Sequence, residues 1–385
     1  MSANSTANNT FGGNAKIKRI IFGMIAVAAV AICTVVGLTG CGKPSDDGKK
    51  VVKIGAILPL TGKFANVGNA MKAGLERATR EIQSDRNTVY KIEYYDTQSE
   101  AKNALTGYNR LKNINKINVF FTAPSDHAFA FKPEIIKDGG LLFAVAPHLE
   151  ITKDNEQLVF QPFNSSENES AYLLQYVFDE LKSERLFVYS HNTEAGATYA
   201  NYFQERLGAD LVGICLFEED AAMLRNISTA NTYKNADCIM VCGLTSGMGL
   251  LIKFIRENGY SGPIVSNIGF SFPAVLASAG DYSKSVTFVD YDFPYASSQH
   301  KAWNDGSLSA YNTSFTFQAY LAYGALCIFD DIYASGVCLP EEIGKHLSVE
   351  QTYIVKAGEE SFEMTTHTDG GITARLRMNS TSETK

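Results

Sequence analysis

The sequence predicts an α/β protein built on parallel sheets, and three observations carry this prediction. The stretch Val51–Leu60 is apolar apart from Lys53 and ends in a loop rich in Gly and Thr, which is typical of a strand buried on both faces. Apolar and small residues then recur at helical spacing from Ala70 to Ile82. The same order of strand and then helix repeats along the chain, which favours a parallel sheet with helices on both faces.

The remaining elements are expected from the same two periodicities. Strands are predicted at 89–96, 117–122, 141–146, 160–164, 185–190, 211–218, 238–242, 264–267 and 286–291. Helices are predicted at 101–112, 133–137, 171–181, 197–207, 248–258 and 314–335. Ser361–Met378 is expected to form a hairpin that turns at Asp369 and Gly370. A body of about 330 residues is long enough for two lobes.

The N-terminus has the pattern of a bacterial lipoprotein signal. A basic cluster at 16–19 precedes a charge-free apolar run at 20–36, and the sequence Leu-Thr-Gly-Cys, which resembles a lipobox, ends at Cys41. We expect residues 1–40 to be a signal peptide, Cys41 to carry the lipid, and residues 41–50 to be a flexible tether to the membrane. A transmembrane anchor is the alternative, because the apolar run is nearly long enough.

Composition excludes several function classes. The chain is acidic, with a formal net charge of −7 and no basic block, so a nucleic-acid partner is not expected. No phosphate-binding loop, G-x-S-x-G motif or paired-cysteine zinc spacing is present, so we expect no enzyme activity and no cofactor. A Cys327–Cys338 bridge stays open as a possibility. The cysteines expected as small core residues are Cys215, Cys238, Cys242, Cys327 and Cys338.

An ordered set of motifs runs along the chain. It comprises Lys53-Ile-Gly-Ala-Ile-Leu-Pro-Leu-Thr-Gly62, Gly68 and Gly74, Tyr95-Asp96, Gly139-Gly140-Leu-Leu-Phe, Arg185-Leu-Phe-Val-Tyr before Gly196, and Phe317-Gln-Ala-Tyr-Leu-Ala-Tyr-Gly-Ala325. These motifs resemble the leucine/isoleucine/valine-binding family, the solute-binding proteins of ABC importers, and the resemblance covers roughly Val52 to Met378.

The resemblance implies the type I periplasmic-binding-protein fold, in which two doubly wound α/β lobes are joined by three crossings. Lobe 1 is expected to hold 51–163 and 293–350, and lobe 2 to hold 168–290 and 351–378, with 379–385 as a disordered tail. The implied function is extracytoplasmic capture of a small solute by hinge closure, for delivery to ABC permease subunits. A sensory protein of the same fold, acting through a receptor partner, is the alternative.

The resemblance also places the solute site on strand-end loops. An amino acid or a similar solute is the family default. Here the hydroxyl near Leu149 is missing, Leu244 stands at a tyrosine position, and Asn267 falls where an acid holds the solute's ammonium. A buried ammonium without a carboxylate is costly, which argues against a plain α-amino acid. The expected ligand-binding residues are Phe64, Ser125, Asp126, His127, Pro147, His148, Leu149, Ala195, Leu244 and Asn267.

Three histidines, His127, His148 and His191, each follow a predicted strand. They are interpreted first as ordinary loop histidines that make local hydrogen bonds. The other interpretations are contact with an anionic or aromatic solute, and a metal site that closes the lobes. No tight ligand spacing supports the metal, so none is expected.

Overall fold

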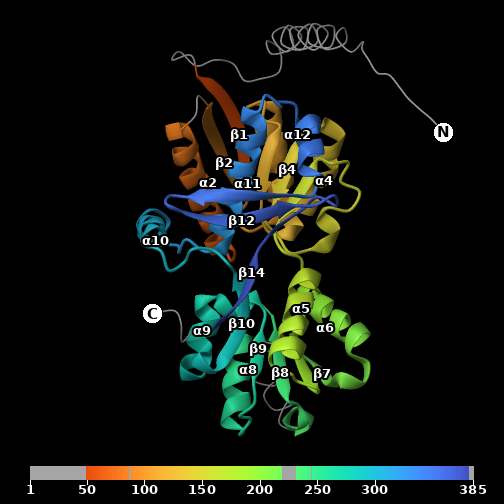
Figure 1. The fold of residues 1–385 in the computed structure, drawn as a ribbon. Coiled ribbons are helices and arrows are strands. Elements are labelled where there is room, and N and C mark those ends of the chain that lie inside the picture. Colours follow the sequence, from red (N-terminus) through yellow and green to blue (C-terminus); the bar gives the residue numbers. More distant parts are fainter. Residues whose placement is uncertain (1–48, 86–87, 219–230, 244, 381–385) are drawn as a thin grey trace, which may run out of the picture. The chain divides into compact units, whose positions relative to one another are not determined.

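The computed structural model describes residues 49–85, 88–218, 231–243 and 245–380. Within them the chain forms two β-sheets, each covered by helices (Figure 1). Strands and helices alternate along the chain and most neighbouring strands run parallel, which confirms the predicted α/β class. Cys41 and the expected signal peptide lie outside the described residues, so both remain predictions.

The first sheet has the strand order β11-β12-β13-β5-β4-β3-β1-β2. Strands β1, β3, β4 and β5 are parallel neighbours, and β3 and β4 are buried along their whole length, as expected for strands covered on both faces. The strands are β1 (Lys50–Leu58), β2 (Thr88–Asp96), β3 (Val119–Thr122), β4 (Leu141–Ala144), β5 (Val159–Pro162), β11 (Gln351–Ala357), β12 (Glu360–Thr366) and β13 (Gly371–Ala374).

The second sheet has the strand order β14-β10-β9-β8-β6-β7. Only β14, at one edge, runs antiparallel to its neighbour. The strands are β6 (Leu186–His191), β7 (Leu211–Phe217), β8 (Cys238–Cys242), β9 (Ile264–Ser266), β10 (Val286–Tyr291) and β14 (Leu376–Ser380).

Helices cover both faces of each sheet. In the first sheet α3 and α4 share one apolar core with β1, β3 and β4, and α2 packs against α11. In the second, α8 and α9 share a core with β6 and β8. The helices are α2 (Ala65–Asp85), α3 (Ala101–Asn113), α4 (Ser125–Asp138), α5 (Ser166–Gln175), α6 (Glu194–Leu207), α8 (Ser246–Glu257), α9 (Pro273–Ala279), α10 (Ser298–Tyr311), α11 (Phe317–Ala334) and α12 (Pro340–Leu347).

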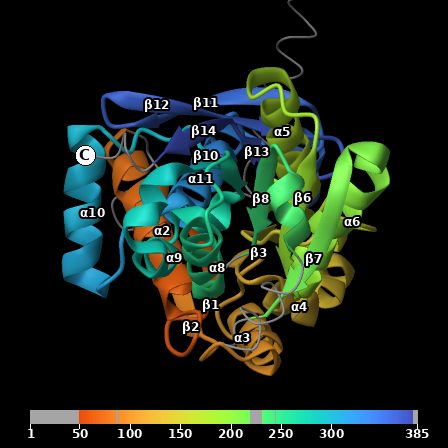
Figure 2. The same cartoon turned by 90° about the horizontal axis from the view of Figure 1, so that it is seen from below.

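Shorter helical turns complete the list: a π-helical turn at Tyr176–Glu180 and 3₁₀ turns at Leu149–Ile151, Gly208–Asp210, Asn231–Asn235, Ile268–Ser271 and Gly280–Ser285. Helix α11 is apolar around its circumference and is buried nearly throughout, as such a helix must be. Helix α10 lies beside α2 (Figure 2).

The chain passes between the two sheets three times, which the doubly wound two-sheet prediction anticipates. Asn164, in the first crossing, bonds to the residues that immediately precede the other two. Its backbone N–H donates to the Tyr291 hydroxyl at 3.1 Å, at the end of β10. Its side chain donates to the Ala374 carbonyl at 3.0 Å and accepts from the Ala374 N–H at 2.9 Å, at the end of β13. The crossings are 163–165, 292–297 and 375.

The C-terminal segment differs from expectation. The resemblance assigns residues 351–378 to lobe 2. Of these, 351–374 instead join the first sheet, because β13 pairs in parallel with β5 and the apolar side chains of β12 face Gly324 of α11. The turn at Asp369 and Gly370 between β12 and β13 is confirmed. Asn379 and Ser380, expected in a disordered tail, end β14.

Three helices, α9, α10 and α12, were not expected from the sequence, and α4 begins at Ser125 rather than near Pro133. Pro133 lies inside α4, where Phe131 and Ile135 are buried in the core, so tertiary packing outweighs the local preference of proline for a helix start. Ser125, Asp126 and His127 are therefore the first turn of a helix and not a loop.

Candidate functional site at the strand ends

Strand order locates a candidate site at the carboxyl ends of the parallel strands. In the first sheet β1 lies between β2 and β3, so the chain winds outward in both directions from β1. In the second, β6 lies between β7 and β8. Ligands of open α/β sheets collect where the winding direction changes, beyond the carboxyl ends of the strands. The loops that follow β1, β3, β6 and β8 are therefore the candidate site.

The loop after β1 is held by the end of β2. The Asp96 carboxylate accepts the Leu60 N–H at 2.9 Å and the Thr61 hydroxyl at 2.7 Å. Partial burial works against ionisation, but the hydrogen bonds from Gln98, Thr61 and Leu60 outweigh it and lower the pKa of Asp96. Gly62 has φ 87°, and a Cβ there would lie 2.7 Å from the Ser99 hydroxyl, so glycine is required.

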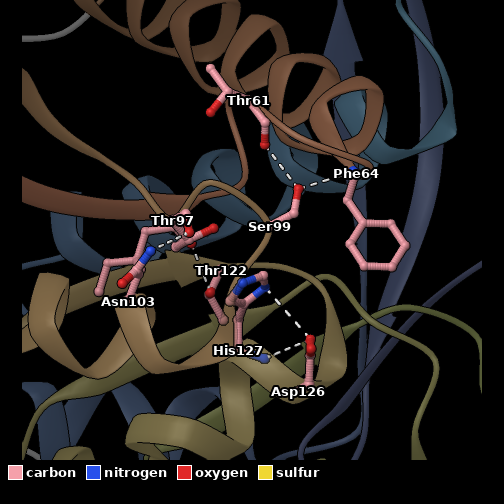
Figure 3. Close-up of polar contacts among 9 residues, drawn as sticks. Thr61, Phe64, Thr97, Ser99, Asn103, Thr122, Asp126 and His127 are labelled. Atoms are coloured by element: carbon pink, nitrogen blue, oxygen red, sulfur yellow. Dashed lines mark hydrogen bonds and ion pairs between the residues drawn. The ribbon is translucent and has the colours of Figure 1, made fainter.

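Ser99 fixes the same loop from the other side. Its hydroxyl accepts the Phe64 N–H at 3.1 Å and donates to the Thr61 carbonyl at 2.8 Å (Figure 3). Phe64 is half-buried, and the Lys63 ammonium lies 4.6 Å from the centre of its ring. These hydrogen bonds thus fix the backbone of the loop after β1 without any solute.

The first turn of α4 forms the opposite wall of this edge. Ser125 is half-buried and Asp126 is exposed, and the Asp126 carboxylate accepts the His127 N–H at 2.9 Å. The His127 ring is fully buried, and neither nitrogen makes a hydrogen bond of ordinary geometry within the described residues. Burial lowers the pKa of His127, although Asp126, 3.6 Å from Nδ1, acts in the opposite direction. Of the three residues, Asp126 is the one with an exposed, charged side chain.

The residues after β4 behave as a local cap. His148 precedes the turn Leu149–Ile151, and its Nδ1 accepts the Glu150 N–H at 3.1 Å, which is the ordinary loop role considered first for the histidines. Its ring meets Phe129 edge-on, with the ring centroids 5.0 Å apart. Pro147 is half-buried and Leu149 is exposed. Phe129 and Leu149 are both exposed, so apolar surface lies beside His148.

In the second sheet the β6 end is tightly packed. His191 ends β6, is 9% exposed and packs against Phe217, with the ring centroids 5.3 Å apart. A Cβ on Gly196 would lie 1.8 Å from the His191 carbonyl oxygen, which explains the glycine in that motif. The side chain of Ala195 and the whole of Leu244 lie outside the described residues, so both sites remain predictions.

Asn267, which follows β9, is fully buried and belongs to a hydrogen-bonded chain with two residues that the sequence did not single out. Its amide donates to the Tyr199 hydroxyl at 3.2 Å, and Tyr199 donates to Glu169. Glu169 also accepts the Ile268 N–H at 2.5 Å. Through Tyr199, the Glu169 carboxyl group is thus linked to Asn267, the position where the resemblance expects an acid. Glu169 lies in the first turn of α5, where an acid is usually explained by the helix dipole, so its burial is not indicated by the sequence pattern.

Burial of Glu169 raises its pKa to about 7, against hydrogen bonds from Tyr199 and Ile268 that lower it.

No group of three or more His, Cys, Asp or Glu side chains suited to a metal ion is found in the part of the chain that the structure describes. None of the helices in the same residues is long and apolar enough to cross a membrane. Cys327 is a free thiol, so a Cys327–Cys338 bridge does not form.

The chain has two doubly wound sheets joined by three crossings, and polar loops lie where the winding direction of each sheet changes. These features define a two-lobed α/β binding protein. A family model described as periplasmic binding protein matches residues 51–331. The chain therefore belongs to the periplasmic binding protein family, and the predicted resemblance to leucine/isoleucine/valine-binding proteins is confirmed.

Particular relatives agree with this assignment. The Leu/Ile/Val-binding protein BraC3 of Rhizobium johnstonii is 24% identical over 289 residues, which are 71% of this chain and 77% of BraC3. LivJ of Streptococcus pneumoniae, solved in complex with isoleucine, has a TM-score of 0.69 and 22% identity, covering 86% of this chain and 96% of LivJ. A Rhodopseudomonas palustris solute-binding protein in complex with 3,4-dihydroxybenzoic acid has a TM-score of 0.68 and 15% identity, covering 86% and 93%.

Proposed function

We propose that this chain is an extracytoplasmic solute-binding lipoprotein of an ABC importer. It captures a small solute between the carboxyl edges of its two sheets, and rotation at the three crossings closes the lobes around it. No bond is made or broken. One observation carries the proposal: in both sheets, the loops where the winding direction changes lie at the carboxyl edge of the strands. The loop after β1 is already fixed there by hydrogen bonds to Asp96 and Ser99.

Asp126 is the first-lobe residue that we assign to charge recognition. It is the exposed acid in the first turn of α4, and it stands beside the half-buried Ser125 hydroxyl. A solute ammonium can pair with Asp126 while its hydrogen-bonding groups meet Ser125 and the loop after β1. An amino acid or similar solute is therefore retained as the proposed class, with the ammonium held from the first lobe rather than at Asn267.

The relatives define the solutes to test. BraC3 is named for leucine, isoleucine and valine, LivJ was solved with isoleucine, and the R. palustris protein was solved with 3,4-dihydroxybenzoic acid. Aliphatic amino acids and aromatic acids are therefore the two solute classes to compare. Phe64, Phe129 and Leu149 supply the apolar surface that either class needs.

The test is thermal unfolding of a soluble form that begins at Lys43, against amino acids, amides, aromatic acids and short peptides. A solute at 100 times its dissociation constant stabilises the folded state by about 2.7 kcal/mol, which raises Tm by several degrees. Asp126→Asn should remove the rise for an ammonium solute, and Glu134→Gln should not, since Glu134 is a half-buried acid on the same helix that pairs with Lys137. A panel without any rise in Tm would refute solute capture and favour the sensory alternative.

The lipid anchor needs its own test. We propose that Cys41 is acylated and that residues 41–50 tether the folded part to the membrane, because a lipobox-like sequence precedes Cys41. Cys41→Ala should move the protein from the membrane fraction to the soluble extracytoplasmic fraction. Retention of the variant in the membrane would support the transmembrane alternative.

A further inference from the structure

A buried chain of hydrogen bonds runs across the carboxyl edge of the second sheet. Glu169 of α5 is 3% exposed; its Oε1 accepts the Ile268 N–H at 2.5 Å and its Oε2 accepts the Tyr199 hydroxyl of α6. Asn267 donates from Nδ2 to the Tyr199 oxygen at 3.2 Å and accepts the Gly243 N–H at Oδ1 at 3.1 Å. The chain thereby joins two helices to the loops that follow β8 and β9.

The charge of Glu169 sets the direction of these bonds. An ionised carboxylate can only accept, so Tyr199 gives its single proton to Glu169 and its oxygen is left to accept from Asn267. Asn267 must therefore turn its NH₂ group to Tyr199 and its carbonyl oxygen to the Gly243 N–H. Both loops are held in one arrangement by a carboxylate that does not itself reach the surface.

The two loops are on the edge where a solute of an open α/β sheet binds, since they follow neighbouring parallel strands next to the winding change at β6. We propose that Glu169 is a positioning residue for the second-lobe half of the solute site, which it orders through Tyr199 and Asn267. This inference rests on the proposed function for its consequence in binding, but the ordering of the loops can be tested without any solute.

Protonation of Glu169 is the natural perturbation. The titratable groups that act on Glu169 or are acted on by it are Tyr199 of α6, Cys242 of β8, and Asp290 and Tyr291 of β10. Burial raises the pKa of Glu169 to about 7, and the Asp290 charge acts in the same direction. Burial also raises the pKa values of Tyr199, Cys242 and Tyr291 well above their ordinary values, so those three groups are neutral.

A protonated Glu169 must donate its new proton to Tyr199, because its other neighbour, the Ile268 N–H, is itself a donor. The Tyr199 hydroxyl proton then loses its acceptor, and the orientation of Asn267 is no longer fixed. Solute affinity should therefore fall as the pH drops through about 7. Glu169→Gln places an NH₂ group where the added proton would be, so it should reproduce the protonated state at every pH.

The experiment follows the backbone amides of Gly243 and Ile268 and the Asn267 side-chain amide by ¹H–¹⁵N NMR from pH 5 to 9, without solute. In the native protein these signals should move together with a midpoint near pH 7. They should lose the midpoint near pH 7 in Glu169→Gln, where Asp290, whose pKa burial raises to about 6, is the remaining group that titrates beside the chain. They should titrate as in the native protein in Glu167→Gln, the same change at an exposed position of the same helical turn. Signals that do not change with pH in the native protein, or that keep a midpoint near pH 7 in Glu169→Gln, overturn the inference.

Isoleucine and 3,4-dihydroxybenzoate are the binding probes, measured by calorimetry at pH 6 and pH 8. A probe that binds should do so about tenfold more weakly at pH 6 and in Glu169→Gln, the loss equivalent to one hydrogen bond, with Glu167→Gln unchanged. Equal affinity in all three proteins would overturn the positioning role. If neither these probes nor the wider solute panel binds, the proposed function fails, while the solute-free amide titration still decides whether Glu169 orders the loops.

Discussion

Removal of the Asn164 side chain should destabilise the protein strongly, because it takes two hydrogen bonds away from buried backbone. In Asn164→Ala the N–H and the carbonyl of Ala374 lose their partners at 2.9 and 3.0 Å. A buried polar group left without a partner costs about 1–3 kcal/mol, so the expected total is about 2–4 kcal/mol. The backbone bond from Asn164 to Tyr291 survives, which keeps the loss below that of removing the whole connection.

Urea unfolding followed by circular dichroism measures this loss as a lower midpoint at an unchanged slope. Asn168→Ala is the matched control, since Asn168 is exposed in the first turn of α5 and the change there should be within about 0.5 kcal/mol of neutral. A loss below about 0.5 kcal/mol in Asn164→Ala would refute the reasoning. It would mean that water replaces the two bonds and that the crossings are not held at this residue.

Three further predictions concern the loops and their acids. Gly62→Ala should cost more than about 1 kcal/mol, because φ is 87° and the new Cβ would meet Ser99 at 2.7 Å; urea unfolding measures it, and a neutral result contradicts the assigned strain. The pKa of Asp96 is lowered in the folded state, so its stabilisation is present above the unfolded pKa of about 3.9 and is lost as the pH falls below that value; in acid unfolding, Asp96→Asn should flatten this part of the stability curve. The pKa of Glu169 is raised from 4.5 to about 7, so the folded state binds more protons and stability should fall as the pH rises between these values, by at most about 3 kcal/mol; the same slope in Glu169→Gln would contradict this.

The regular part of the fold could be predicted because its sequence patterns are strong. The strand at 238–242 and the strand at 286–291 are found with the expected bounds, since both are short apolar runs that are buried within a parallel sheet. The C-terminal strands show that a sequence pattern can predict a strand without predicting the sheet in which it lies. The sequence predicts a hairpin at Ser361–Met378, but it carries no information about which sheet the hairpin joins, and only the pairing of β13 with β5 decides it.

The sequence predicts which loops carry the candidate residues, but it does not predict the burial of each side chain. The positions of Asp126 and His127 after β3 follow from the order of strands and loops. Their exposure does not, because adjacent residues in the first turn of α4 point in different directions, one to solvent and one into the core. Glu169 was missed for a related reason. An acid near a helix start is common, and only the approach of Tyr199 and Ile268, far away in sequence, turns it into a buried group.

The last stretch of the chain completes both sheets, since β11–β13 extend the first and β14 pairs with β10 in the second. A chain that emerges N-terminus first therefore cannot complete the first sheet until β13 has emerged, or the second until β14 has emerged. Until then the edges of β5 and β10 lack their strand partners, and the contacts still to form are distant in sequence, which slows folding. Topology alone thus delays the native state of both lobes until the strands at 351–380 are available to pair.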